Sequence, residues 1–184
     1  GIGLAVADGV FAPLPAFAAL VGALLIQVGT NFANDYYDAK HGADTDEREG
    51  FTRVTADGLI QPGQVRVAMI ATYALAVAVG IYLVYVGCVA IVVVGLSSIL
   101  AGLLYTGGPY PYGYYCLGDL FVFVYFGLVA VTGTYYVQAV TALGVDPLAV
   151  GVTGEAITGG HPLAGCGAGA PATTILVVNT IRDM

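Results

Sequence analysis

Long uncharged stretches, separated by short polar segments, are the dominant pattern along this chain. No Asp, Glu, Lys or Arg occurs from Gly9 to Asn34, from Val67 to Gly118, or from Leu120 to Val145. Each stretch exceeds the ~20 apolar residues that a helix needs to cross a bilayer. None has the alternation of apolar and polar residues that is typical of a transmembrane barrel strand. The pattern therefore predicts an all-α integral membrane helical bundle.

The middle stretch is too long for one span. A helix from Val67 to Tyr105 would extend nearly 60 Å, about twice the ~30 Å hydrocarbon core, so it must turn, most simply near Gly87 and Cys88. We expect five or six transmembrane helices. Their ranges are roughly 14–38, 65–86, 88–105, 118–142 and a weaker one near 163–180, with residues 1–8 as the end of an earlier helix.

Composition agrees with a membrane environment, because 58% of residues are hydrophobic and only 9% are charged, against about 25% in soluble proteins. The first residue is not Met, and the chain stops two residues after Arg182. Nothing at the start has the charged flank and cleavage site of a signal peptide. We expect residues 1–184 to be one transmembrane domain, present in part.

Counting the spans places loops 39–64 and 106–117 and the C-terminal end on one side of the membrane. All five cations then lie on that side, namely Lys40, Arg48, Arg53, Arg66 and Arg182. The positive-inside rule identifies this side as cytoplasmic. We expect a multi-pass protein of the cell (plasma) membrane, with the two loops as cytoplasmic caps over the active site. The net charge of −7 disfavours nucleic acid as a partner.

The segment from Gln27 to Arg53 gathers amides, carboxylates and cations at the end of an apolar run. If the helix continues to Asp38, five polar residues share one face, at i, i+4, i+7, i+8 and i+11: Gln27, Asn31, Asn34, Asp35 and Asp38. Carboxylates crowded at the mouth of a bilayer repel one another unless a cation neutralises them. Oxygen ligands without a nearby Cys favour Mg²⁺, the usual partner of a phosphate-bearing substrate. The alternative is a solvated acidic loop.

A second segment repeats the arrangement. Asn34-x-x-x-Asp38 ends one hydrophobic segment and Asn179-x-x-x-Asp183 ends another, both on the cytoplasmic side. We expect the two copies to face each other across a cavity, each offering an amide and a carboxylate to its own metal ion. A diphosphate would bridge the two ions, which requires carboxylates within about 10 Å across the site.

Several motifs carry a resemblance to a known family. They are Asn34-Asp35-Tyr36-Tyr37-Asp38 with Gly42-Ala43-Asp44, Tyr105-Thr106-Gly107-Gly108-Pro109, Leu117-Gly118-Asp119-Leu120-Phe121, and Val177-Val178-Asn179-Thr180-Ile181-Arg182-Asp183. The first and last resemble the two aspartate-rich motifs of the UbiA superfamily of intramembrane prenyltransferases. The middle two resemble the branch that acts on 1,4-dihydroxy-2-naphthoate in menaquinone synthesis. The likeness covers most of residues 14–142 and the last ten.

The resemblance implies Mg²⁺-dependent transfer of a polyprenyl group from polyprenyl diphosphate to an aromatic acid, with decarboxylation, giving demethylmenaquinone and diphosphate. The implied metal ligands are Asn34, Asp35, Asp38, Asp44, Asn179 and Asp183, of which Asp35, Asp38 and Asp183 are the catalytic carboxylates. The implied diphosphate contacts are Lys40, Arg48, Arg53 and Arg182. The implied acceptor or prenyl pocket includes Gln27, Asn31, Tyr105, Tyr112, Tyr114 and Asp119. The tyrosines are equally typical of an interfacial aromatic belt, and Asp119 of a helix N-terminal dipole partner.

Other functions stay open beside this one. The family has about nine helices, whereas this 184-residue chain is expected to have five or six, so an inactive fragment is one alternative. Acceptors such as 4-hydroxybenzoate or a lipid glycerol are others. A cation transporter would place acids near mid-membrane on broken helices, but here they lie at helix ends beside cations. A phosphotransferase for CDP-alcohols would carry an Asp-Gly and Ala-Arg signature, which the sequence lacks.

Overall fold

All the regular secondary structure in the described part of the chain is helical, without a strand. The computed structural model describes residues 1–41, 60–87, 89–115 and 117–144. The elements are α1 (Ile2–Ala7), α2 (Pro13–His41), α3 (Pro62–Gly87), α4 (Ala90–Leu104), the 3₁₀ helix η1 (Tyr112–Tyr115), α5 (Gly118–Val122), the π-helix η2 (Phe123–Val129) and α6 (Ala130–Ala142). The all-α prediction is confirmed. The helix predicted near 163–180 lies outside the described residues.

Helix boundaries follow the local sequence. Both α2 and α3 begin at a proline, Pro13 and Pro62, where the missing N–H is harmless and the fixed φ suits the first helical turn. The break predicted near Gly87 is found, because α3 ends there and α4 begins at Ala90. Glycine is needed at this break, since a Cβ on Gly87 would lie 2.5 Å from Cγ2 of Val137 in α6. The α3–α4 corner therefore packs directly on α6.

Three helical segments are long and apolar enough to cross a membrane: Pro13–Lys40, Pro62–Gly87 and Gly118–Ala142. The helix α4 is apolar too but has only 15 residues, a length of about 22 Å. The third span is continuous but irregular, since the seven π-helical residues of η2 separate α5 from α6. These helices confirm the prediction of a helical membrane protein.

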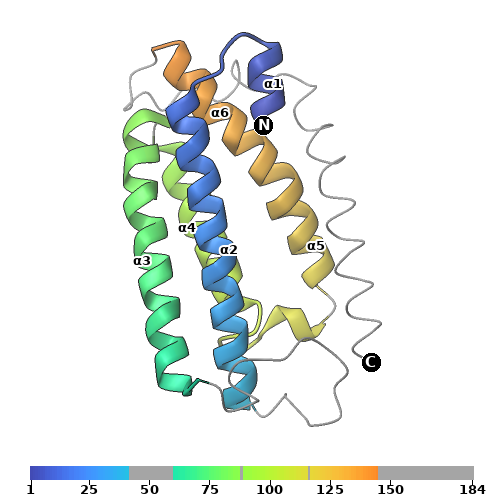
Figure 1. Ribbon diagram of the computed structural model, residues 1–184. Helices are drawn as coiled ribbons and strands as arrows, with labels where there is room; N and C mark the ends of the chain where they lie inside the picture. The colour runs from blue at the N-terminus through green and yellow to red at the C-terminus, as the bar shows by residue number, and fades with distance from the viewer. Residues whose placement is uncertain (42–59, 88, 116, 145–184) are drawn as a thin grey trace.

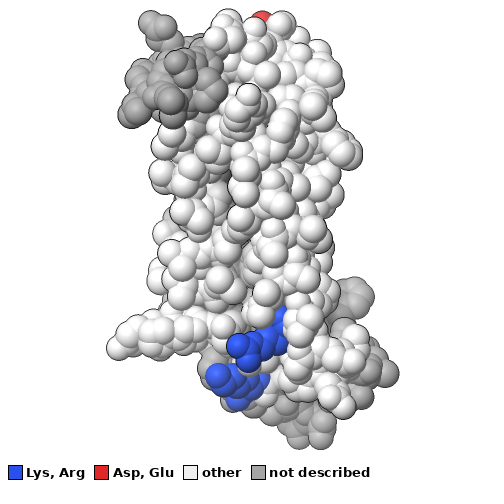
Figure 2. All heavy atoms as spheres, turned by 90° about the vertical axis from the view of Figure 1, so that its left-hand side faces the viewer, with Lys and Arg blue, Asp and Glu red and all other residues white. Residues whose placement is uncertain are grey.

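The spans run in alternating directions, so that several chain segments meet at one end. In Figure 1, α2 descends, α3 returns upward and α4 descends again, which brings the end of α2, the start of α3, the end of α4 and η1 to the lower end. On the face shown in Figure 2, Lys and Arg side chains are visible only near the bottom, and Asp or Glu is visible only at the upper edge. The described cations are Lys40 and Arg66.

The lower half of the bundle is fixed by a junction of α2, α3 and α4. The hydroxyl groups of Thr30 and Tyr73 are hydrogen-bonded at 3.2 Å. Gly102 of α4 lies so close that a Cβ there would be 2.2 Å from Oγ1 of Thr30. Ala33, Met69 and Tyr73 form the buried core cluster beside this contact. The junction therefore sets the position of α2 relative to α4 about one turn before the polar end of α2.

Candidate active site

The polar end of α2 presents its side chains in different environments. Because α2 continues to His41, the five polar residues from Gln27 to Asp38 do lie on one helix with the predicted spacing. Asp38 is buried, with only 3% of its surface exposed. Asn34 and Asp35 are half-buried, and Asn31 is exposed. A carboxylate this deeply buried requires hydrogen-bonding or charged partners to offset its lost hydration.

Partners for Asp38 and Asn34 come from the connection between α4 and α5, residues 105–117. The hydroxyl of Tyr114 donates a hydrogen bond to Oδ1 of Asp38. The hydroxyl of Thr106, which is 3% exposed, donates to Oδ1 of Asn34 at 3.0 Å. The structure thus brings together residues more than 70 positions apart in the sequence.

Glycines allow the connection to approach α2 closely. A Cβ on Gly107 would lie 2.6 Å from the Leu103 carbonyl oxygen and 2.7 Å from the Tyr37 ring. Gly108 has a φ of +84°, a left-handed conformation that residues with a Cβ rarely adopt. The two adjacent glycines therefore let the chain turn against the α2 surface immediately after Thr106.

A row of aromatic rings packs the 105–117 connection against α5 and η2. Tyr105 meets Tyr112 edge to face at 5.5 Å, Tyr112 stacks on Phe121 at 4.1 Å, and Phe121 stacks on Tyr125 at 6.1 Å. The Tyr112 hydroxyl also donates to the Ala101 carbonyl of α4 at 2.7 Å. Burial raises the pKa of Tyr112, and the neighbouring phenol of Tyr105 adds to the effect, so the hydroxyl stays a donor at neutral pH. The aromatic row links α4, η1, α5 and η2.

The described residues supply part of a metal site. Asn34, Asp35 and Asp38 offer only oxygen donors from carboxylates and an amide, which fits a hard cation such as Mg²⁺. Across the described ranges, no group of three or more His, Cys, Asp or Glu side chains forms a cluster able to hold a metal. The other predicted ligands, Asp44, Asn179 and Asp183, lie outside the described residues, as do Arg48, Arg53 and Arg182.

Three further predicted site residues lie on α2 and α5. Lys40 is exposed at the end of α2, and Gln27 is half-buried further along the same helix. Asp119 is half-buried in the first turn of α5, close in sequence to η1. The position of Asp119 at the start of a helix agrees with a favourable interaction with the helix dipole. Its expected contact with the acceptor or the prenyl chain stays a prediction.

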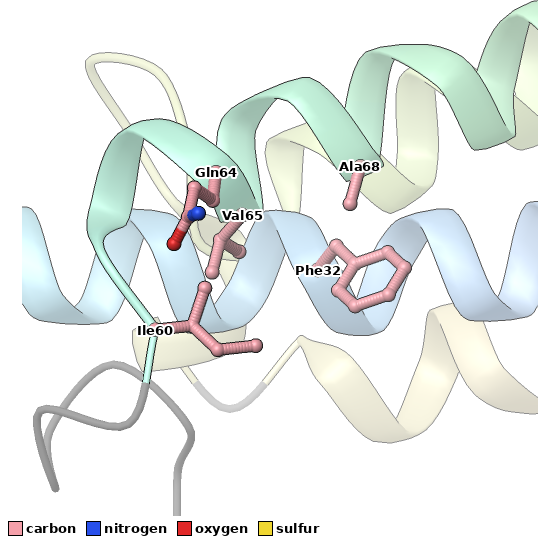
Figure 3. Close-up of a pocket in the computed structure, with 5 residues that line it drawn as sticks. All are labelled: Phe32, Ile60, Gln64, Val65 and Ala68. Atoms are coloured by element: carbon pink, nitrogen blue, oxygen red, sulfur yellow. The ribbon is translucent and has the colours of Figure 1, made fainter.

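A groove of about 430 Å³ lies on a different side of α2. It is lined by Phe32, Ile60, Gln64, Val65 and Ala68, which Figure 3 shows between α2 and the first turns of α3. Phe32 and Asn34 are two positions apart on a helix, which puts them on nearly opposite sides. The groove is therefore separate from the polar side chains that meet the 105–117 connection.

Sequence reasoning missed Thr106. Thr106 belongs to the Tyr105–Pro109 motif, which resembles a motif of the family, but the motif alone did not predict a role for the Thr106 hydroxyl. A signal was present, because Thr106 is a polar residue followed by two glycines, an arrangement that permits close backbone approach. Its partner on α2 could not be inferred, since the pairing depends on how α2 and α4 are packed.

Comparisons with known proteins place these motifs in a family. The model of the UbiA prenyltransferase family matches residues 1–181. A 1,4-dihydroxy-2-naphthoate octaprenyltransferase from Escherichia coli is 37% identical over 190 aligned residues, which cover 100% of this chain and 57% of that protein. The enzyme of the same name from Mycobacterium tuberculosis is 38% identical over 169 residues, 92% of this chain and 52% of that protein.

More distant relatives include a UbiA prenyltransferase domain-containing protein 1 from Rattus norvegicus, 29% identical over 77% of this chain and 41% of that protein. No solved structure matches the chain. The chain spans about half the length of the curated relatives described above. Since the family model covers almost the whole sequence and relatives above 30% identity align along nearly all of it, the chain belongs to the UbiA prenyltransferase family.

Proposed function

We propose that the protein containing this chain transfers a polyprenyl group from polyprenyl diphosphate to 1,4-dihydroxy-2-naphthoate, with Mg²⁺ as cofactor. The immediate product after decarboxylation is demethylmenaquinol, which gives demethylmenaquinone in a separate two-electron oxidation, and diphosphate is released. Support comes from the family and from the names of the relatives that align over most of the chain. The observation that carries the proposal is the buried carboxylate of Asp38 at a helix end beside Asn34 and Asp35.

The charge of the leaving group decides the chemistry of such a reaction. An allylic diphosphate ionises when its developing negative charge is stabilised, and a bound Mg²⁺ supplies this stabilisation. Asn34, Asp35 and Asp38 would hold one ion, with Asp44 assisting, and Asn179 and Asp183 a second. Lys40, Arg48, Arg53 and Arg182 would bind diphosphate oxygens through charge-assisted hydrogen bonds.

The aromatic row suits the other product of ionisation. When the C–O bond breaks, its electron pair leaves with the diphosphate, and the prenyl cation must be kept from water until the acceptor ring attacks it. Rings of Tyr105, Tyr112 and Phe121 form a contiguous aromatic surface beside the connection that holds Asp38. Such a surface stabilises a cation by its π electrons. The new C–C bond then forms, the bond between the ring and the carboxylate breaks as CO₂ leaves, and the electron pair of that bond restores the aromatic hydroquinone.

We also propose that this end of the bundle faces the cytoplasm of a plasma membrane. Lys40 and Arg66 both lie at the end where α2 finishes and α3 begins, in agreement with the positive-inside rule. Cysteine placed at exposed Gln64 should react with a membrane-impermeant maleimide only in inside-out vesicles. Labelling in right-side-out vesicles would show that this end faces the outside and would contradict the proposed orientation. A background lacking Cys88, Cys116 and Cys166 serves as the control.

The experiment that tests the activity compares acceptors. The full-length protein in detergent, supplied with Mg²⁺ and a polyprenyl diphosphate, receives either 1,4-dihydroxy-2-naphthoate or 4-hydroxybenzoate, each labelled in its carboxyl group. We expect turnover of the naphthoate with release of labelled CO₂, and none after EDTA treatment. A preference for 4-hydroxybenzoate, or a product that keeps the label, would contradict the acceptor while leaving the prenyltransferase class intact.

A further inference from the structure

The 105–117 connection contacts two of the proposed metal ligands through the side-chain hydroxyl groups of Tyr114 and Thr106. Tyr114 donates to Asp38, and Thr106 donates to Asn34 at 3.0 Å. Asp38 and Thr106 are each 3% exposed, whereas Tyr114 is 51% exposed, so each bond has one partner that is shielded from water. Hydrogen bonds to a buried charged group are stronger than those at the surface and expensive to lose.

The two bonds restrict the rotation of the side chains that would bind the cation. A carboxylate or an amide at a helix end has several rotamers, and a partner on one oxygen selects among them. Side chains that orient metal ligands in this way matter energetically, because their mutation typically lowers metal affinity or activity by about 10- to 100-fold. Thr106 and Tyr114 occupy this position relative to Asn34 and Asp38.

The connection is itself anchored, so the two hydroxyl groups are held in place. Tyr112, two residues before Tyr114 in η1, donates to the Ala101 carbonyl at 2.7 Å and stacks on Phe121 at 4.1 Å. The backbone N–H of Gly113 donates to the Tyr105 carbonyl at 2.9 Å. Thus η1 turns Tyr112 toward α4 and α5 and Tyr114 toward α2, so that the 105–117 connection is bonded to helices on both of its sides.

We propose that Tyr114 and Thr106 are positioning residues, which set the orientation of Asp38 and Asn34 for the divalent cation before the substrate binds. The inference rests on the proposed function, because it assigns a role to residues that surround the same site. It also assigns the 105–117 connection a role in cation binding, in addition to covering the site.

The test measures cation binding and catalysis in the full-length protein. Tyr114→Phe and Thr106→Val remove the hydroxyl groups with little change of shape, Thr106→Ser restores one, and Tyr115→Phe is the matched control on an exposed neighbour in η1. Mg²⁺ affinity is measured by calorimetry in the presence of an unreactive prenyl diphosphate analogue. We expect Tyr114→Phe and Thr106→Val to weaken binding about 10- to 100-fold. Thr106→Ser and Tyr115→Phe should bind like the wild type.

Steady-state kinetics separate positioning from a purely structural role. With positioning, the Mg²⁺ concentration for half-maximal turnover rises in Tyr114→Phe, while saturating Mg²⁺ restores most of kcat and the melting temperature in EDTA changes little. Unchanged Mg²⁺ affinity in both variants would overturn the inference. So would a fall in melting temperature with kcat lost at every Mg²⁺ concentration. A wild-type protein that binds Mg²⁺ with the analogue but transfers no prenyl group contradicts the proposed function and not the positioning.

Discussion

Replacing Gly107 by alanine should displace the 105–117 connection from α2. The added Cβ would lie 2.6 Å from the Leu103 carbonyl oxygen, and reaching an ordinary contact of 3.4 Å requires a shift of about 0.8 Å. The Leu103 oxygen is backbone, so the strain is relieved mainly by moving the loop. If the shift is directed away from α2, the 3.0 Å bond between Thr106 and Asn34 lengthens to about 3.8 Å, beyond hydrogen-bonding range.

Two quantities should therefore change in Gly107→Ala. Overpacking of this kind costs about 1–3 kcal/mol of folding free energy, which thermal or denaturant unfolding in detergent would detect. The loss of the Thr106 contact should raise the Mg²⁺ requirement about tenfold, as in Thr106→Val. Gly95→Ala in α4 is the control, since its Cβ meets nothing within 4 Å and alanine favours a helix by about 0.5–1 kcal/mol. If Gly107→Ala has the stability and the Mg²⁺ dependence of the wild type, the 105–117 connection does not approach α2 as closely as described.

Three further predictions concern single sites. Asp38→Ala in the full-length protein should abolish prenyl transfer while the protein still folds, and more than a tenth of wild-type turnover would argue against a metal-binding role. Gly102→Ala should destabilise the α2–α3–α4 junction by about 1–3 kcal/mol in an unfolding assay, because its Cβ would lie 2.2 Å from Oγ1 of Thr30; an unchanged midpoint would contradict that packing. Burial raises the pKa of Tyr112, so its contribution to stability is complete below the ordinary value of about 10 and is lost as pH rises above it. Tyr112→Phe should flatten the alkaline fall in melting temperature, and an identical pH profile would exclude this role.

The fold was predictable because uncharged stretches are limited by the thickness of a bilayer. The predicted helix 118–142 has the bounds of the observed span, and the predicted 14–38 differs from Pro13–His41 by a few residues at its polar end. The helix α2 continues through the polar residues to His41. The α3–α4 break followed from length alone.

For the candidate site, the sequence predicted which residues lie together on one helix, but not which residues of other helices contact them. Helical spacing places Asn34 and Asp38 together, since they are one turn apart. The partners of these residues depend on tertiary packing, because the direction in which η1 turns Tyr114 is set by rings and a carbonyl contributed by α4 and α5. Tyr112 bonds to α4 and Tyr114 to α2, and whether both line an acceptor or prenyl pocket stays a prediction. Whether Asn179 and Asp183 oppose Asn34 and Asp38 stays a prediction.

The π-helical segment η2 has a consequence for how this family should be aligned. A π-turn accommodates one residue more than an α-turn over the same length, so it acts as a single-residue insertion that the helix absorbs without a loop. Deleting one residue between Phe123 and Val129 should regularise the span and leave α6 in nearly the same orientation relative to α5, because the residue removed is the one that the π-turn absorbs. Tyr135 and Gln138 of α6 would then keep their buried positions. A one-residue alignment gap within this span therefore marks the absence of the π-turn, while the helical register on both sides and the membrane crossing are preserved.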